Sequence, residues 1–140
     1  MPVALEIVSP EKLLLSRQVD MAVVPGSEGD IGVLPGHAPM IIMLRGGVVS
    51  IYEGEQVTGR LFVSSGFAEI TPDRCTVLAD EAVPVGELVK AEAEARLAAA
   101  EASYQAMGTT AENAADMLAQ ELAIERVLSA QAMVDAASGS

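Results

Sequence analysis

The sequence predicts an α+β protein in two segments: an all-β sandwich or barrel over residues 1–84, then an antiparallel two-helix hairpin over residues 85–140. Three observations support this division. All seven Pro and nine of the twelve Gly residues precede position 85. Apolar residues of the first segment alternate with a period of two, which is typical of strands. In the second segment 17 of 56 residues are Ala, and apolar positions recur at helical spacing.

Short strands separated by turns are expected throughout residues 1–84. Alternating burial is expected at Val3, Leu5 and Ile7, at Leu61 and Val63, and at Cys75, Val77 and Ala79. Turn-forming pairs stand between these runs at Pro25-Gly26, Pro35-Gly36, Gly46-Gly47, Glu53-Gly54 and Pro72-Asp73. Most of these pairs stand roughly 8–12 residues apart, which favours an all-β sandwich or barrel.

The second segment is expected to form two helices with a tight connection. The first would run over about 86–107 and end at Gly108, with a narrow apolar stripe of Leu88, Ala91, Ala95, Ala98 and Ala102. The second would run over about 110–136, because Thr109 followed by Glu112 is typical of a capping box. It is expected to bury Leu118, Leu122, Val127 and Leu128, with Met117 and Ile124 on the flanks.

Charge and composition exclude several partners. Twenty acidic residues against eight basic ones leave a net charge of −12, which repels nucleic acids and anionic lipids. Only two Tyr and two Phe are present, so the aromatic platforms of base-stacking modules are missing. No apolar run approaches the ~20 residues of a membrane span. The start of the sequence lacks the basic stretch of a signal peptide, so a reducing cytoplasm is expected.

Few residues could carry metal or nucleophilic chemistry. The sequence has one histidine, His37, and one cysteine, Cys75. His37 stands in a Pro-Gly-His-Ala-Pro turn, where contacts with backbone groups are expected rather than catalysis. Cys75 lies in an alternating strand and is expected to be a small buried hydrophobe. No metal and no cofactor is therefore expected, although a pair among the twenty acidic residues could still serve a stand-alone β-sandwich hydrolase.

The densest motif lies in residues 25–39, where Gly26, Gly29 and Gly32 have a G-x-x-G-x-x-G spacing. A phosphate cradle would need Gly-Lys-Ser/Thr at the start of a helix, and this segment has none. Glu28 and Asp30 would also repel phosphate. The glycines are better explained by tight turns that require positive φ angles.

Residues 28–39, Glu-Gly-Asp-Ile-Gly-Val-Leu-Pro-Gly-His-Ala-Pro, resemble the signature of the epsilon subunit of bacterial F-type ATP synthases. Residues 7–12, 65–70 and 77–80 also resemble that family. The resemblance covers residues 3–84 and is looser over 85–140. It implies a ten-stranded β-sandwich that binds the gamma subunit and the ring of c subunits, followed by a helical hairpin.

The resemblance also implies a non-catalytic role on the central rotor stalk, at the cytoplasmic face of the bacterial inner membrane and without insertion into lipid. The subunit would couple proton-driven ring rotation to the catalytic head through gamma. Carried over residue by residue, the c-ring contact would consist of Ser27, Glu28, Gly29, Asp30 and His37.

Two departures from the family bear on regulation. Many members bind ATP through Ile/Leu-Asp-x-x-Arg-Ala, but the matching positions here are Leu88, Val89, Glu92 and Ala93. A glutamate in place of the arginine opposes polyphosphate, so no nucleotide binding is expected. The hairpin, which would meet the catalytic beta subunits, carries three basic residues against nine acidic ones, so auto-inhibition through basic contacts is not expected. The alternative within the same complex is an ATP-responsive inhibitory regulator.

Overall fold

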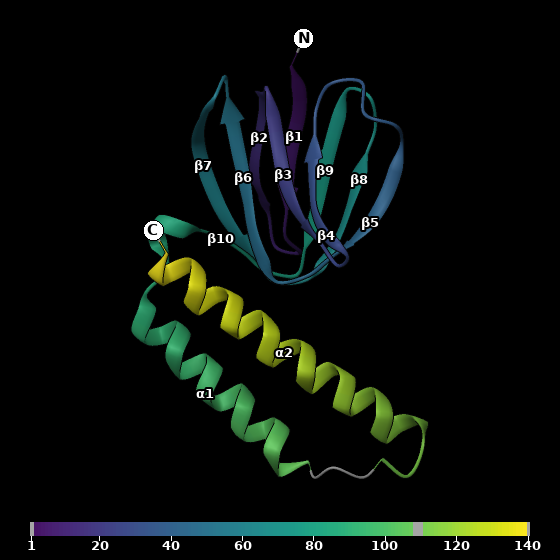
Figure 1. Ribbon diagram of the computed structural model, residues 1–140, viewed down its shortest axis with the longest axis vertical. Coiled ribbons are helices and arrows are strands. Elements are labelled where there is room, and N and C mark those ends of the chain that lie inside the picture. Colours follow the sequence, from purple (N-terminus) through teal and green to yellow (C-terminus); the bar gives the residue numbers. More distant parts are fainter. Residues whose placement is uncertain (1, 108–110, 140) are drawn as a thin grey trace. The chain divides into compact units, whose positions relative to one another are not determined.

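The chain folds into two compact units, Met1–Glu87 and Leu88–Ser140. The computed structural model describes residues 2–107 and 111–139 (Figure 1).

The first unit is a β-sandwich of ten strands that nearly closes into a barrel, which confirms the predicted fold class. The strands are β1 (Val3–Val8), β2 (Leu13–Val19), β3 (Met21–Gly26), β4 (Gly29–Val33), β5 (Met40–Leu44), β6 (Gly47–Glu53), β7 (Gln56–Val63), β8 (Gly66–Ile70), β9 (Arg74–Ala79) and β10 (Ala82–Pro84). Their order is β10-β7-β6-β3-β5-β8-β9-β1-β2, with β4 paired to β3. β1 and β9 are parallel, and the other pairs described are antiparallel.

Period-two alternation builds the core of this unit, as predicted. In β1 and β9 every second residue is buried, and the members of this set are Val3, Leu5, Ile7, Cys75, Val77 and Ala79. Removing such side chains from water is the main favourable term in folding. β7 departs from simple alternation, because Phe62 is fully buried between two core residues, Leu61 and Val63. Phe62 lies outside the main core cluster, so β7 is covered on both faces at this position.

The second unit contains α1 (Lys90–Ala106) and α2 (Ala114–Ser138), which pack against each other. The predicted start of the first helix at residue 86 is wrong, since Val85–Glu87 forms a short 3₁₀ turn and helix α1 begins at Lys90. No side chain caps that start. None of the described helices is long and apolar enough to cross a membrane.

The predicted start of the second helix is also wrong. Helix α2 begins at Ala114, and Asn113 is its N-cap, with Oδ1 accepting the Asp116 amide at 2.9 Å. Asp116 Oδ2 in turn accepts the Glu112 amide at 3.2 Å. Asn caps at least as well as Thr, and Asp116 adds the acidic partner. The predicted stop at Gly108 and cap at Thr109 lie outside the described residues.

Most of the apolar positions predicted to be buried in the helices are exposed, and Val127 is half-buried. Leu118, Leu122 and Leu128 are exposed, with Leu128 at 64%, whereas Ala123, Ala130 and Met133 are buried. In α1 the buried residue is Ala93, and the expected stripe at Ala91, Ala95, Ala98 and Ala102 is exposed. Burial in the two helices is therefore confined to a few positions, mostly alanines, and the larger apolar side chains Leu118, Leu122 and Leu128 of α2 remain exposed.

Gly66 lies where the backbones of β8 and β9 approach each other closely, and its substitution tests that contact. Its φ is +138°, and a Cβ there would overlap the Leu78 carbonyl oxygen of the neighbouring strand. We expect Gly66→Ala to lower the unfolding free energy by about 2–4 kcal/mol, because strain and steric overlap add. Gly86→Ala is the matched control, since a Cβ at Gly86 meets nothing within 4 Å. Urea unfolding measures both, and equal stability of the two variants would contradict this account.

Candidate interaction surfaces

The first surface is a hairpin tip formed by residues 27–30. β3 pairs with β4 as far as Gly26↔Gly29, so Ser27 and Glu28 form a two-residue turn. A Cβ on Gly26 would stand only 2.7 Å from the Gly29 carbonyl oxygen, and Gly29 has a φ of +140°. Glycine is therefore needed on both sides of the turn. The predicted turn at Pro25-Gly26 is displaced, because both residues belong to β3.

Neighbouring strands hold the hairpin tip in place. The Ser27 amide donates to the Met43 carbonyl oxygen at 2.8 Å, and the Arg45 amide donates to the Pro25 carbonyl oxygen at 3.0 Å. The Arg45 guanidinium also forms an ion pair with the Asp30 carboxylate. All four residues of the tip are exposed, so the turn presents a fixed polar surface to solvent.

His37 is not part of this tip. Ser27 and Glu28 precede β4 and His37 follows it, so the strand β4 (labelled in Figure 1) separates them along the chain. The predicted turn at Pro35-Gly36 is present: Gly36 has a φ of +84°, and the His37 amide donates to the Leu34 carbonyl oxygen at 3.2 Å. His37 Nδ1 lies 2.7 Å from the Ala38 carbonyl oxygen, a contact with the backbone as predicted.

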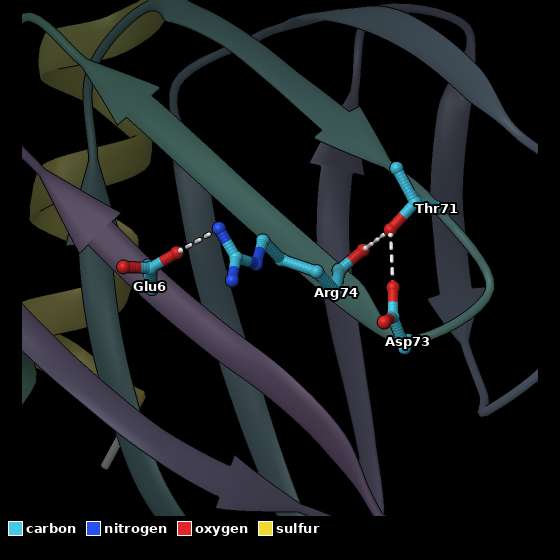
Figure 2. A network of polar contacts seen from close by, with 4 residues as sticks. All are labelled: Glu6, Thr71, Asp73 and Arg74. Atoms are coloured by element: carbon cyan, nitrogen blue, oxygen red, sulfur yellow. Dashed lines mark hydrogen bonds and ion pairs between the residues drawn. The ribbon is translucent and has the colours of Figure 1, made fainter.

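A network of polar contacts stabilises the β8–β9 turn at the same end as His37. Figure 2 shows Arg74 Nη1 on β9 reaching Glu6 Oε1 on β1, a distance of 3.5 Å. The Thr71 hydroxyl lies 3.1 Å from Asp73 Oδ1 and 3.2 Å from the Arg74 carbonyl oxygen. The carbonyl oxygen of Pro72, within this turn, accepts the Gly36 amide at 2.6 Å. This network connects the turn to β1 and to the loop of His37, which gives it a structural role.

The second surface is an apolar row on the outer face of the sandwich. Cross-strand pairing places Met43, Phe67, Leu78, Val8 and Leu13 opposite one another along β5, β8, β9, β1 and β2. Met43 is 63% exposed and Phe67 40%, and Leu13 is also exposed. Ile41, two residues before Met43, extends the row on the same face. Contiguous exposed apolar side chains mark interaction sites more often than scattered ones.

The apolar row borders the hairpin tip, since the Met43 carbonyl oxygen accepts the Ser27 amide. Sequence reasoning missed both this row and the role of Arg45. The run Met40-Ile41-Ile42-Met43-Leu44 looks uniformly buried in the sequence, and only the pairing with β8 shows that Ile41 and Met43 face outwards. No spacing signal connects Arg45 to Asp30, which lies fifteen residues away.

The remaining candidate residues are Cys75 and the positions of the nucleotide motif. Burial raises the pKa of the Cys75 thiol to about 11, which keeps it protonated at neutral pH. In the nucleotide motif, Ala93 is buried while Val89 and Glu92 are exposed. No group of three or more His, Cys, Asp or Glu side chains in the described residues could hold a metal ion.

Comparisons with known proteins identify the family of the β-sandwich and relatives of most of the chain. Residues 2–85 match the family model described as ATP synthase, Delta/Epsilon chain, beta-sandwich domain. The ATP synthase epsilon chain of Granulibacter bethesdensis is 58% identical over 96% of this chain and 96% of its own length. That of Gluconacetobacter diazotrophicus is 48% identical over 99% of this chain and 95% of its own length.

Two solved structures share the fold. A chain of the Euglena gracilis mitochondrial ATP synthase structure, described as OSCP/F1/c-ring, has a TM-score of 0.69 at 25% identity, covering 94% of this chain and 80% of that one. A chain of the Tetrahymena thermophila central stalk/c-ring structure has a TM-score of 0.67 at 13% identity, covering 99% and 98%. The fold and these relatives define a subunit of a rotary ATP synthase. The chain belongs to the ATP synthase epsilon chain family and is a non-catalytic subunit of that enzyme, which confirms the prediction.

Proposed function

We propose that this chain is a rotor subunit of the central stalk of a proton-translocating F-type ATP synthase, where it connects the gamma subunit to the ring of c subunits. The observation that carries the proposal is the juxtaposition of two different surfaces, the apolar row and the polar hairpin tip, on one rigid sandwich. A subunit that transmits torque needs two such contacts on a body that does not deform between them. Two backbone hydrogen bonds support that rigidity: the Ser27 amide donates to the Met43 carbonyl oxygen, and the Arg45 amide donates to the Pro25 carbonyl oxygen.

The apolar row is the proposed gamma contact. Permanent subunit contacts have apolar centres, and the row supplies one through Met43, Phe67 and Leu78. The hairpin tip is the proposed ring contact, through Ser27, Glu28, Gly29 and Asp30. Acidic side chains on a fixed turn suit basic and amide groups on the loops of a ring. His37 is left out of the proposed contact, because it follows β4 whereas the turn at Ser27 and Glu28 precedes it.

Binding at the cytoplasmic face of the bacterial inner membrane would then depend on protein contacts. The net charge of −12 supports this, because anionic lipid surfaces repel such a chain.

The proposed gamma contact is tested by the double substitution Met43→Ser with Phe67→Ser. We expect the affinity for purified gamma to fall about tenfold or more, since truncation at the centre of an interface is costly. Both side chains point away from the core, so folding should be retained, which circular dichroism checks.

Leu34→Ser is the matched control, because Leu34 is also an exposed apolar residue but lies at the other end of β4. Calorimetric titration measures the affinity of each variant for gamma. Unchanged affinity in the double variant, or an equal loss in Leu34→Ser, would contradict the assignment.

We also propose that the chain does not sense ATP. Glu92 stands exposed where nucleotide-binding members carry arginine, and its charge opposes a polyphosphate. Calorimetry with millimolar ATP is expected to show no saturable heat. Saturable binding of ATP would contradict this proposal and would instead identify an ATP-responsive regulator.

A further inference from the structure

The side chain of Arg45 crosses from the end of β5 to the hairpin tip, and the sequence leaves room for it to do so. A Cβ on Gly47 would stand 2.8 Å from Arg45 Nη1 and 2.8 Å from Pro25 Cβ. Since both distances are shorter than real Cβ contacts allow, a larger residue at Gly47 would displace the guanidinium. The glycine therefore keeps open the position from which Arg45 reaches Asp30.

This ion pair contributes little to folding. The side chains of Arg45 and Asp30 are 45% and 60% exposed, and pairs in such surroundings have small effects on stability. Its effect is on the position of the hairpin tip. Two backbone hydrogen bonds hold β3 against β5 beside the tip, while the ion pair holds the β4 side of the hairpin.

The pair also distinguishes the two carboxylates of the tip. The charge of Asp30 is compensated by Arg45 within the chain. Glu28 is exposed on the turn itself, and the described residues place no cationic side chain within ion-pair distance of it. An uncompensated carboxylate at the apex of a fixed turn is available to a cationic partner.

We propose that Arg45 is the positioning residue of the hairpin tip: it retains Asp30 in an internal ion pair and leaves Glu28 as the carboxylate that meets a cationic group of the c-ring. This deepens the proposed function and rests on it. It also divides the residues implied by family resemblance into one that contacts the ring, Glu28, and one that orients the turn, Asp30.

The positioning role is tested first in the isolated full-length chain, without any partner. The readout is hydrogen exchange of the Ser27 amide, which donates to the Met43 carbonyl oxygen. Arg45→Gln is expected to speed this exchange several-fold. The charge swap Asp30→Arg with Arg45→Asp should restore it, because the ion pair is re-formed in reverse.

Arg74→Gln is the control, since it removes an exposed arginine ion pair at the opposite end of the sandwich and should leave the Ser27 amide unchanged. Unchanged exchange in Arg45→Gln, or no restoration by the swap, would overturn the positioning role whether or not the tip binds a ring.

The contact role is tested by capture of the detergent-solubilised c-ring on the complex of this chain with gamma. Glu28→Gln is expected to weaken capture about tenfold, Arg45→Gln to weaken it less, and the charge swap to restore it to within about threefold of the unmodified chain.

The outcomes separate this inference from the proposed function. If Asp30→Asn abolishes capture, the swap does not rescue it and Glu28→Gln binds normally, Asp30 itself meets the ring and the inference is overturned, while the ring contact stands. If no tip variant changes capture, the assignment of Glu28 and the proposed ring contact both fail.

Discussion

The cross-strand register of the sandwich is the constraint on which both interaction surfaces depend. Each of the neighbouring strands β5, β8, β9, β1 and β2 directs one set of side chains into the core and the alternate set outwards. A shift of one residue would exchange the two sets, burying Met43 and Phe67 and exposing core residues such as Ala68. Gly66 allows this register, because only glycine fits against the Leu78 carbonyl oxygen of β9.

The same register explains why the tip is rigid although it consists of a short exposed turn. Gly26 pairs with Gly29 on one side and with Leu44 on the other, so β3 is held between two strands up to its last residue. A turn that starts from such a strand has little freedom. The ion pair of Arg45 with Asp30 adds a side-chain constraint on the β4 side of the tip.

Much of the sandwich could be predicted from the sequence, because period-two alternation is local and strong in β1 and β9. The surfaces could not. The outward direction of Met43 depends on its pairing with β8, and the partner of Asp30 depends on β5 ending beside β3, so both are properties of topology. The helices show the reverse error: Leu118 and Leu128 look like core residues by size but are exposed, while the buried positions of α2 are Ala123, Ala130 and Met133.

We propose that the non-catalytic sandwich joins two partners, gamma and the c-ring, through these surfaces. The most direct measurement is capture with the affinity-tagged full chain from detergent-solubilised membranes of its host, followed by mass-spectrometric identification of the bound proteins. We expect both gamma and subunit c to be recovered, in association with the remaining synthase subunits. Recovery of the folded chain with neither gamma nor subunit c would contradict it.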